Sequence, residues 1–384
     1  MGRYLNQGTD SFEKSVNSEI YVDKTGLIKY TNRVMNTLQG YVCVSRPRRF
    51  GKSTAANMLT AYYCRGCDSR DIFSKFEISK SSDFETYRNK YNTISLNMQE
   101  FLSRSDNIEA LIARVQKLVL RDLKREYPDV DYFDDTDLVE SIQDIYEKEK
   151  CPFVVIIDEW DCIFREFRQD KEAQEKYLDF LRDLLKDKAC IHLAYMTGIL
   201  PIKKYGTHSA LNMFDEFSMI NPGPLAPYVG FTEKEVQALC NKYKMDMDEV
   251  KAWYDGYAFS HSQSVYSPRS VVNSMLFRKI ENYWNQTETF EALQIYIDMN
   301  FDGLKDDVLG MIAGESIPVN TGSFTNDMTT FRTEDDVLTL LIHLGYLAYD
   351  LENKIVKIPN NEVRNEYVNS VAASNWGAVS TALK

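Results

Sequence analysis

The chain has 384 residues, of which 44% are hydrophobic and 27% charged, and it carries a net charge of −12. Single hydrophobic cores stop growing at roughly 250 to 300 residues, so this length excludes one small module and predicts two or three domains. The negative balance argues against a surface that coats nucleic acid or anionic membrane non-specifically.

The ends and the cysteines favour a cytoplasmic protein. The N-terminal residues lack the apolar segment of a secretory signal, and no run of about 18 apolar residues is present to span a bilayer. The seven cysteines are odd in number and scattered, which is typical of reduced thiols rather than of a disulfide framework. We therefore expect a cytoplasmic location and no membrane partner.

The first sharp pattern is a phosphate-binding loop. A β-favouring run at 41–44 is followed by a turn and then by a helical pattern from Ala55 to Ala61. The residues between them end in the Gly-Lys-Ser of the P-loop motif, although Arg46 stands where that motif has its first Gly. The predicted binding residues are Arg46, Pro47, Arg48, Arg49, Phe50, Gly51, Lys52, Ser53 and Thr54.

Each part of this loop has a chemical role in the motif. Backbone N–H groups and the helix N-terminus cradle phosphates, Lys52 reaches the β and γ oxygens, and the Ser53 hydroxyl binds Mg²⁺. Arg48 has two open interpretations, an ion pair with an acid such as Asp23 or Asp161, or neutralisation of phosphate charge in place of an arginine finger. For Arg49 the ion pair is favoured.

A second motif follows about a hundred residues later. After a predicted strand at 92–98 and an amphipathic helix over 108–119, the apolar run 153–157 reads as a buried parallel strand that ends at Asp158-Glu159. Nucleotide hydrolysis needs a carboxylate at the Mg²⁺ and a group that orients or deprotonates water, so we assign these roles to Asp158 and Glu159. The alternative is that two acids simply end a buried strand.

A further strand completes the predicted core. A helix over 177–185 precedes a strand at 191–198, where Thr197 is a candidate to hydrogen bond the γ-phosphate or the attacking water, or is a strand-ending turn. Strands that alternate with helices predict an α/β fold with a parallel sheet. The Pro-rich stretch 221–227 breaks this rhythm, so we place the P-loop domain at 1–225.

The remainder is predicted to be mostly helical. Thr232 and Glu235 form a capping-box pair, and helical patterns cover 246–254 and 268–283, which gives a helical domain over 226–330. A helix at 334–344 with strands at 346–351 and 354–358 predicts a winged-helix-like unit over 331–384. That unit has five Lys and Arg against seven Asp and Glu, which disfavours direct nucleic-acid binding and favours protein packing or a relay role.

Together the motifs resemble the bacterial AAA-ATPase-like family of P-loop proteins, which are related to STAND and archaeal-type ATPases. The resemblance covers about residues 10 to 370 and rests on the loop string 46–53 and on five further motifs. These are Tyr21-Val22-Asp23-Lys24-Thr25, Ile157-Asp158-Glu159-Trp160-Asp161, Thr197-Gly198-Ile199-Leu200-Pro201-Ile202, Trp253-Tyr254-Asp255-Gly256-Tyr257 and Leu344-Gly345-Tyr346-Leu347.

The resemblance implies a fold and site residues. It implies an additional-strand P-loop core followed by a helical domain and a winged-helix-like unit, with ATP rather than GTP as the nucleotide. It also implies that Lys52 and Ser53 contact phosphate and Mg²⁺, that Asp158 is the Walker-B acid and that Glu159 is the general base. Trp160 departs from the Tyr usual in the family. The 254–257 turn either reports the nucleotide state, as a similar motif does in STAND relatives, or ends a helix with two core aromatics.

Family members commonly continue into a PD-(D/E)xK nuclease-like domain. This sequence stops at Lys384, shortly after residues 359–364, where such a domain would begin. We interpret it as either a shortened sequence or a natural short form, and we expect no nuclease activity from these residues. The leading hypothesis is an Mg²⁺-dependent ATPase whose nucleotide state controls an effector domain or protein partner. The alternative is a non-hydrolysing scaffold that senses ATP and binds a protein. Glu159 favours turnover, because a scaffold does not need that carboxylate. The sequence does not define an oligomeric state.

Overall fold

The computed structural model describes residues 2–202, 211–260, 263–284, 290–299, 301, 303–325, 329 and 331–373. The chain forms two compact units, one of Met1–Ser45 with Lys52–Glu216 and the other of Arg46–Gly51 with Phe217–Lys384. The division into three domains at 225 and 330 stays a prediction, and residues 374–384 of the winged-helix-like unit lie outside the described ranges.

The first unit is built on a five-stranded sheet with the order β2-β3-β4-β1-β5. Its strands are β1 (Tyr41–Ser45), β2 (Asn92–Asn97), β3 (Phe153–Asp158), β4 (Ile191–Gly198) and β5 (Asp215–Phe217). The pairs β2/β3, β3/β4 and β4/β1 are parallel. Because β4 lies between the strand before the phosphate loop and the strand that ends at Asp158, the predicted additional-strand α/β core is confirmed.

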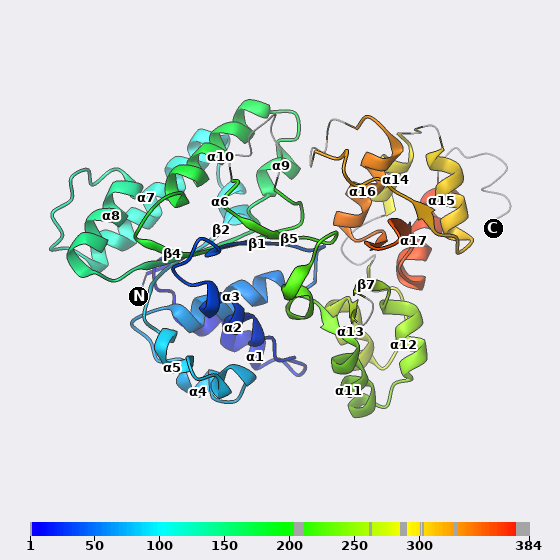
Figure 1. The fold of residues 1–384 in the computed structure, drawn as a ribbon, viewed down its shortest axis with the longest axis horizontal. Coiled ribbons are helices and arrows are strands. Elements are labelled where there is room, and N and C mark those ends of the chain that lie inside the picture. The colour runs from blue at the N-terminus through cyan, green and yellow to red at the C-terminus, as the bar shows by residue number, and fades with distance from the viewer. Residues whose placement is uncertain are drawn as a thin grey trace. The chain divides into compact units, whose positions relative to one another are not determined.

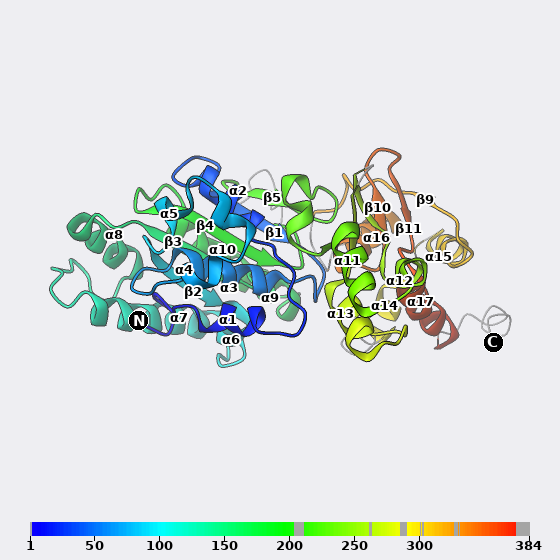
Figure 2. The ribbon, with the colours of Figure 1, turned by 90° about the horizontal axis from the view of Figure 1, so that it is seen from below.

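Helices cover both faces of this sheet (Figure 1). On one face lie α1 (Asp10–Val16), α2 (Gly26–Val34), α3 (Lys52–Tyr63), α4 (Arg70–Phe73), the 3-10 turn Glu77–Lys80 and α5 (Phe84–Tyr87). On the other lie α6 (Met98–Leu102), α7 (Ile108–Glu126), α8 (Leu138–Glu149), α9 (Cys162–Glu166) and α10 (Lys171–Leu185). The helix after the phosphate loop, α3, lies across the sheet and packs on β2, β3 and β4 (Figure 2). Every residue of β3 is buried, as expected for a central parallel strand.

Local sequence accounts for the helix boundaries. The Asn107 side chain accepts a hydrogen bond from the N–H of Ala110, which caps the start of α7, and Leu111, Val115 and Val119 then recur on its buried face. All seven cysteines are free thiols, as predicted. Across the described ranges, no helix combines the length and the apolar character needed to cross a membrane.

The second unit begins with a small sheet among helices. Its first part contains a 3-10 helix (Gly223–Tyr228), β6 (Phe231–Thr232), α11 (Glu233–Tyr243), α12 (Met247–Tyr254), β7 (Tyr257–Ser260), β8 (Gln263–Tyr266), α13 (Pro268–Phe277), α14 (Phe290–Ile297) and α15 (Leu304–Ile312). The predicted capping box of Thr232 and Glu235 is present. The antiparallel sheet β6-β8-β7 was not predicted. The helix predicted over 268–283 ends at Phe277, because Arg278 takes a left-handed conformation.

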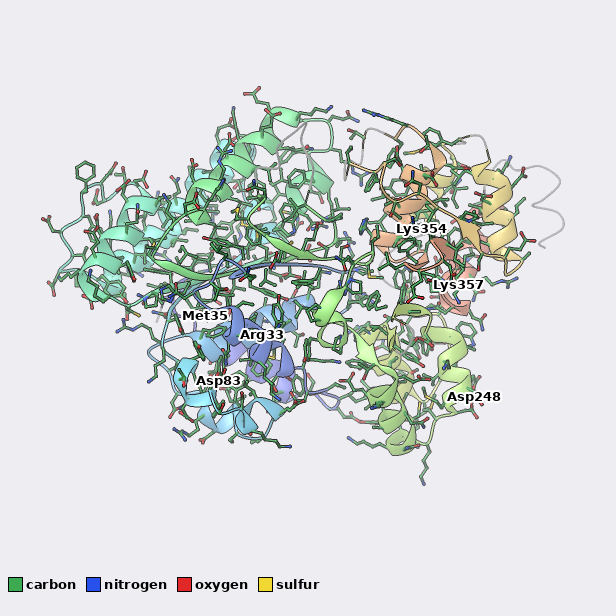
Figure 3. The ribbon with its side chains drawn as sticks, viewed as in Figure 1. Arg33, Met35, Asp83, Asp248, Lys354 and Lys357 are labelled. Atoms are coloured by element: carbon green, nitrogen blue, oxygen red, sulfur yellow. The ribbon has the colours of Figure 1, made fainter. Side chains whose placement is uncertain are left out.

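The last part contains β9 (Ile317–Pro318), α16 (Glu334–Leu344), β10 (Ala348–Asp350), β11 (Ile355–Lys357) and α17 (Asn361–Ala373). The predicted helix and hairpin over 334–358 are confirmed, and β9 extends the hairpin to a three-stranded sheet. Lys354 and Lys357 of this hairpin are labelled in Figure 3. Both are exposed, as is Glu352 in the turn before them, so the hairpin carries exposed charges of both signs.

Candidate nucleotide-binding site

The polar residues predicted for the site meet at one edge of the parallel sheet. In the strand register Asn97 lies beside Asp158, and Asp158 lies beside Thr197, each at the carboxyl end of its strand. Open α/β sheets bind ligands outside the carboxyl ends of their strands. The first unit therefore presents an amide, a carboxylate and a hydroxyl residue on the edge where such a ligand would lie.

Asp158 is at the centre of this group. Its buried carboxylate is hydrogen bonded by the Ser53 hydroxyl, by the N–H of Glu159 at 3.0 Å and by the Asn97 amide at 3.4 Å. Burial raises the pKa of Asp158 to about 6, against the opposing effects of the Ser53 hydrogen bond and the Lys52 charge. The structure thus brings together three residues that the sequence placed in one site, Lys52, Ser53 and Asp158.

Lys52 is a buried ammonium surrounded by acids. Burial lowers its pKa, and the charges of Glu159, Asp161 and Asp158 act in the opposite direction. These carboxylates already compensate the ammonium, so contact between Lys52 and a phosphate stays a prediction of the motif. Ser53, the next residue, is exposed and can be reached from solvent.

The loop before Lys52 has the backbone that phosphate binding needs. Arg49 and Gly51 both have left-handed backbones, with φ values of 67° and 91°. A Cβ at position 51 would touch nothing within 4 Å, so glycine serves the backbone conformation there rather than close packing. Because α3 begins at Lys52, the N–H groups of its first turn lack intrahelical acceptors and can bind an anion.

Two side chains of the phosphate loop, Arg46 and Phe50, contact other residues of the second unit. The buried Arg46 donates from Nη1 to the carbonyl of Phe217 at 2.9 Å, and its guanidinium lies 4.9 Å from the centre of the Phe259 ring. The rings of Phe50 and Tyr257 meet edge to face at 5.4 Å between centroids. These side chains shape the loop, so phosphate binding by 46–51 stays a prediction that depends on the backbone. Arg48 is exposed, and both interpretations of it stay open.

Glu159 is held by a cluster that the sequence did not reveal. Its backbone is left-handed, with φ 54°, its side chain is 22% exposed, and its Oε2 forms an ion pair with Nη2 of Arg165. Arg165 Nε also lies 3.3 Å from Oδ2 of the fully buried Asp161. Burial alone would lower the pKa of Arg165, but the charges of Asp161 and Glu159 outweigh it and raise that pKa. The one sequence signal for this cluster is the four-residue spacing of Asp161 and Arg165.

Thr197 is buried, and its hydroxyl donates to the carbonyl of Val44 at 3.0 Å. A γ-phosphate oxygen accepts hydrogen bonds only, so the hydroxyl would have to leave Val44 in order to bond it. Its oxygen keeps a lone pair that could accept a hydrogen bond from a water admitted to the site. Because the residue is fully buried, both roles predicted for Thr197 stay predictions.

The residues present also fit a magnesium ion. Among the described residues, no group of three or more His, Cys, Asp and Glu side chains is arranged to hold a metal. Mg²⁺ at a phosphate site keeps several waters and takes only one or two protein ligands beside the phosphates. One hydroxyl and one carboxylate, Ser53 and Asp158, supply such a donor set without a larger cluster.

The additional-strand sheet, the loop and the cluster of Lys52, Ser53 and Asp158 define an ATP-binding protein of the P-loop class. Residues 6–207 match the family described as "Predicted AAA-ATPase", and the chain belongs to this family.

One similar curated protein is the "Uncharacterized protein in vnfD 5'region" of Azotobacter chroococcum mcd 1. It is 26% identical over 280 residues, which cover 70% of this chain and 51% of the relative, so the chain spans about half the length of that protein.

Two similar solved structures are archaeal proteins. The Walker-type ATPase PABY2304 of Pyrococcus abyssi has a TM-score of 0.45 at 13% identity, covering 90% of this chain and 94% of that one. The ORC2 protein of Aeropyrum pernix, as ADPNP-ADP complexes, has a TM-score of 0.36 at 11% identity, covering 93% and 97%. Both similarities are distant.

Proposed function

We propose that this protein is an Mg²⁺-dependent ATPase that works as a nucleotide-driven switch for an effector domain or protein partner. The observation that carries the proposal is the hydrogen bond of the Ser53 hydroxyl to Asp158 beside the buried Lys52, with the Glu159 carboxylate one residue further on. ATP is the substrate expected from the family.

Binding is assigned to the loop and to the start of α3. The backbone N–H groups of residues 48–54 would surround the phosphates, since Pro47 has no N–H, and the Lys52 ammonium would balance part of their charge. Ser53 and Asp158 would hold Mg²⁺. When bound, this ion would neutralise negative charge on the phosphate oxygens. Burial disfavours the charged form of Lys52, and the phosphate charge would add to the effect of Glu159, Asp161 and Asp158, which favours it.

Hydrolysis is assigned to Glu159. The attacking water forms a bond to the γ-phosphorus, the bond from that phosphorus to the β–γ bridging oxygen breaks, and the proton of the water passes to the Glu159 carboxylate. The partial exposure of Glu159 allows water to reach it. The Thr197 oxygen would accept the second hydrogen bond from this water.

The switch would act through the loop. Tyr257, whose ring packs on Phe50, donates its hydroxyl to the carbonyl of Gly345 at 2.6 Å. A Cβ at Gly345 would lie 2.7 Å from Cγ of Pro47, so the loop touches this glycine directly. A loop movement on nucleotide binding would therefore shift the start of β7, where the 253–257 motif ends, and the end of α16, where the 344–347 motif begins.

The test is phosphate release from ATP with Mg²⁺ and with EDTA, for the wild type, Lys52→Ala and the exposed control Lys75→Ala. We expect release only with Mg²⁺ and an ATP affinity about 10- to 100-fold weaker in Lys52→Ala, because a charge-assisted contact is worth roughly 1.5–3 kcal/mol. The control should match the wild type. Tight ATP binding without release in the wild type would instead identify the alternative, a nucleotide-sensing scaffold that binds a protein.

A further inference from the structure

We infer that Arg165 is a positioning residue for the general base, and that it ties Glu159 through Asp161 to the loop that follows β4. The inference rests on the proposed function, since it concerns the residue assigned to accept the proton of the attacking water. It adds a residue that neither the motifs nor the comparisons identify.

One guanidinium bridges two carboxylates at this point of the first unit. Nη2 of Arg165 pairs with Oε2 of Glu159, and Nε lies 3.3 Å from Oδ2 of Asp161. The Arg165 side chain is only 10% exposed. A partly buried pair of this kind is screened less by solvent than a surface ion pair, and the planar guanidinium fixes the direction as well as the distance of its partners.

The far end of the bridge is anchored to backbone. Oδ2 of Asp161 accepts hydrogen bonds from the N–H groups of Ile199 at 3.0 Å and Leu200 at 2.8 Å. A Cβ at Gly198 would lie 2.5 Å from Oδ1 of Asp161, so the last residue of β4 packs directly on this carboxylate. Asp161 therefore cannot move without the segment that also carries Thr197, and Arg165 transmits that constraint to Glu159.

The geometry suits orientation of a base. A free glutamate side chain has three rotatable bonds, whereas Glu159 is held at one oxygen by a guanidinium that is itself held. The pair uses Oε2, which assigns Oε1 to the water. A misplacement of about 1 Å at a reacting group can cost about 100-fold in rate. A lysine in place of Arg165 would only partly replace it, because an ammonium lacks the planar guanidinium fork that contacts both carboxylates.

The experiment compares Arg165→Ala and Arg165→Lys with the wild type in kcat, KM for ATP, equilibrium ATP affinity and thermal midpoint. We expect kcat to fall about 10- to 100-fold in Arg165→Ala and less in Arg165→Lys, with ATP affinity unchanged in both. The matched control is Arg88→Ala. Arg88 also bridges two carboxylates in the first unit, Asp68 at 2.6 Å and Glu85 at 2.8 Å, with a 9% exposed side chain. The Arg88→Ala variant should be less thermally stable than the wild type, yet at temperatures below its melting point it should have the wild-type kcat.

A second comparison separates positioning from a structural role. In a Glu159→Gln background, single-turnover hydrolysis should be no slower when Arg165→Ala is added, because the base through which Arg165 acts is already gone. An equal loss in both backgrounds would overturn the inference, as would an unchanged kcat in Arg165→Ala. If Arg165→Ala does not fold, the same comparison is made with Arg165→Lys. Absence of turnover in the wild type would overturn the proposed function and this inference together.

Discussion

The buried carboxyl of Glu362 should make the stability of the second unit depend on pH. Glu362 lies on α17, where its Oε1 accepts hydrogen bonds from the N–H groups of Tyr283 at 2.6 Å and Trp284 at 2.9 Å. The Ser270 hydroxyl donates to Oε2 at 2.9 Å. Burial raises the pKa of Glu362 to about 7, although these three hydrogen bonds oppose the change.

The sign follows from the protons bound. An unfolded glutamate loses its proton near its ordinary pKa of 4.5, whereas the folded chain keeps it up to a pH of about 7. The free energy of unfolding therefore falls as the pH rises between these values and levels off above them. The difference between 4.5 and about 7, at roughly 1.4 kcal/mol per pH unit, corresponds to about 3 kcal/mol.

Glu362→Gln should remove most of this dependence. The amide oxygen can accept from the two backbone N–H groups, and the amide nitrogen can donate to the Ser270 hydroxyl, so the variant keeps the hydrogen bonds without titrating. Burial also raises the pKa of the neighbouring Glu366, which leaves a smaller slope in the variant. The assay is urea unfolding from pH 5 to 8, with the exposed Glu249→Gln as control. Equal slopes for the wild type and Glu362→Gln would refute the reasoning.

Three further substitutions test the packing around the site. Gly198→Ala should destabilise the first unit by about 1–3 kcal/mol and lower turnover, because the added Cβ would lie 2.5 Å from Oδ1 of Asp161. Unchanged thermal melting and turnover in this variant would contradict the prediction. Tyr257→Phe should lower the free energy of unfolding in urea by about 1–3 kcal/mol, because the buried carbonyl of Gly345 loses its 2.6 Å hydrogen bond. A decrease of less than about 0.5 kcal/mol would refute this prediction. Thr197→Val keeps the strand and removes the hydroxyl, so phosphate release should slow while ATP affinity stays, and an unchanged rate would exclude a role in orienting water.

Much of the first unit could be predicted because its signals are local. Five consecutive apolar residues before Asp158 indicate a strand buried on both faces, and Gly51-Lys52-Ser53 between a strand and a helix indicates a phosphate loop. Both elements form as expected, and the sheet order brings their ends into one site. The position of Asp158 beside Ser53 follows from parallel strands sharing a carboxyl edge.

The parts that sequence reasoning missed depend on distant partners or on very short elements. Arg46 binds the carbonyl of Phe217, 171 residues away, so nothing near Arg46 in the sequence could show that its side chain is buried. The strands β6, β7 and β8 have two to four residues each, too few for a period-two pattern. Arg165 reaches Asp161 and Glu159 only because 162–166 forms a short helix after the strand end.

The most direct test of the hydrolytic switch measures ATP affinity and phosphate release on the same preparations of wild type and Glu159→Gln with Mg²⁺. A general base typically contributes about 10²- to 10⁴-fold. The account predicts that Glu159→Gln binds ATP at least as tightly as the wild type and releases phosphate at least about 100-fold more slowly. Equal rates of release from both proteins would contradict it, because the proton of the attacking water would then be accepted elsewhere.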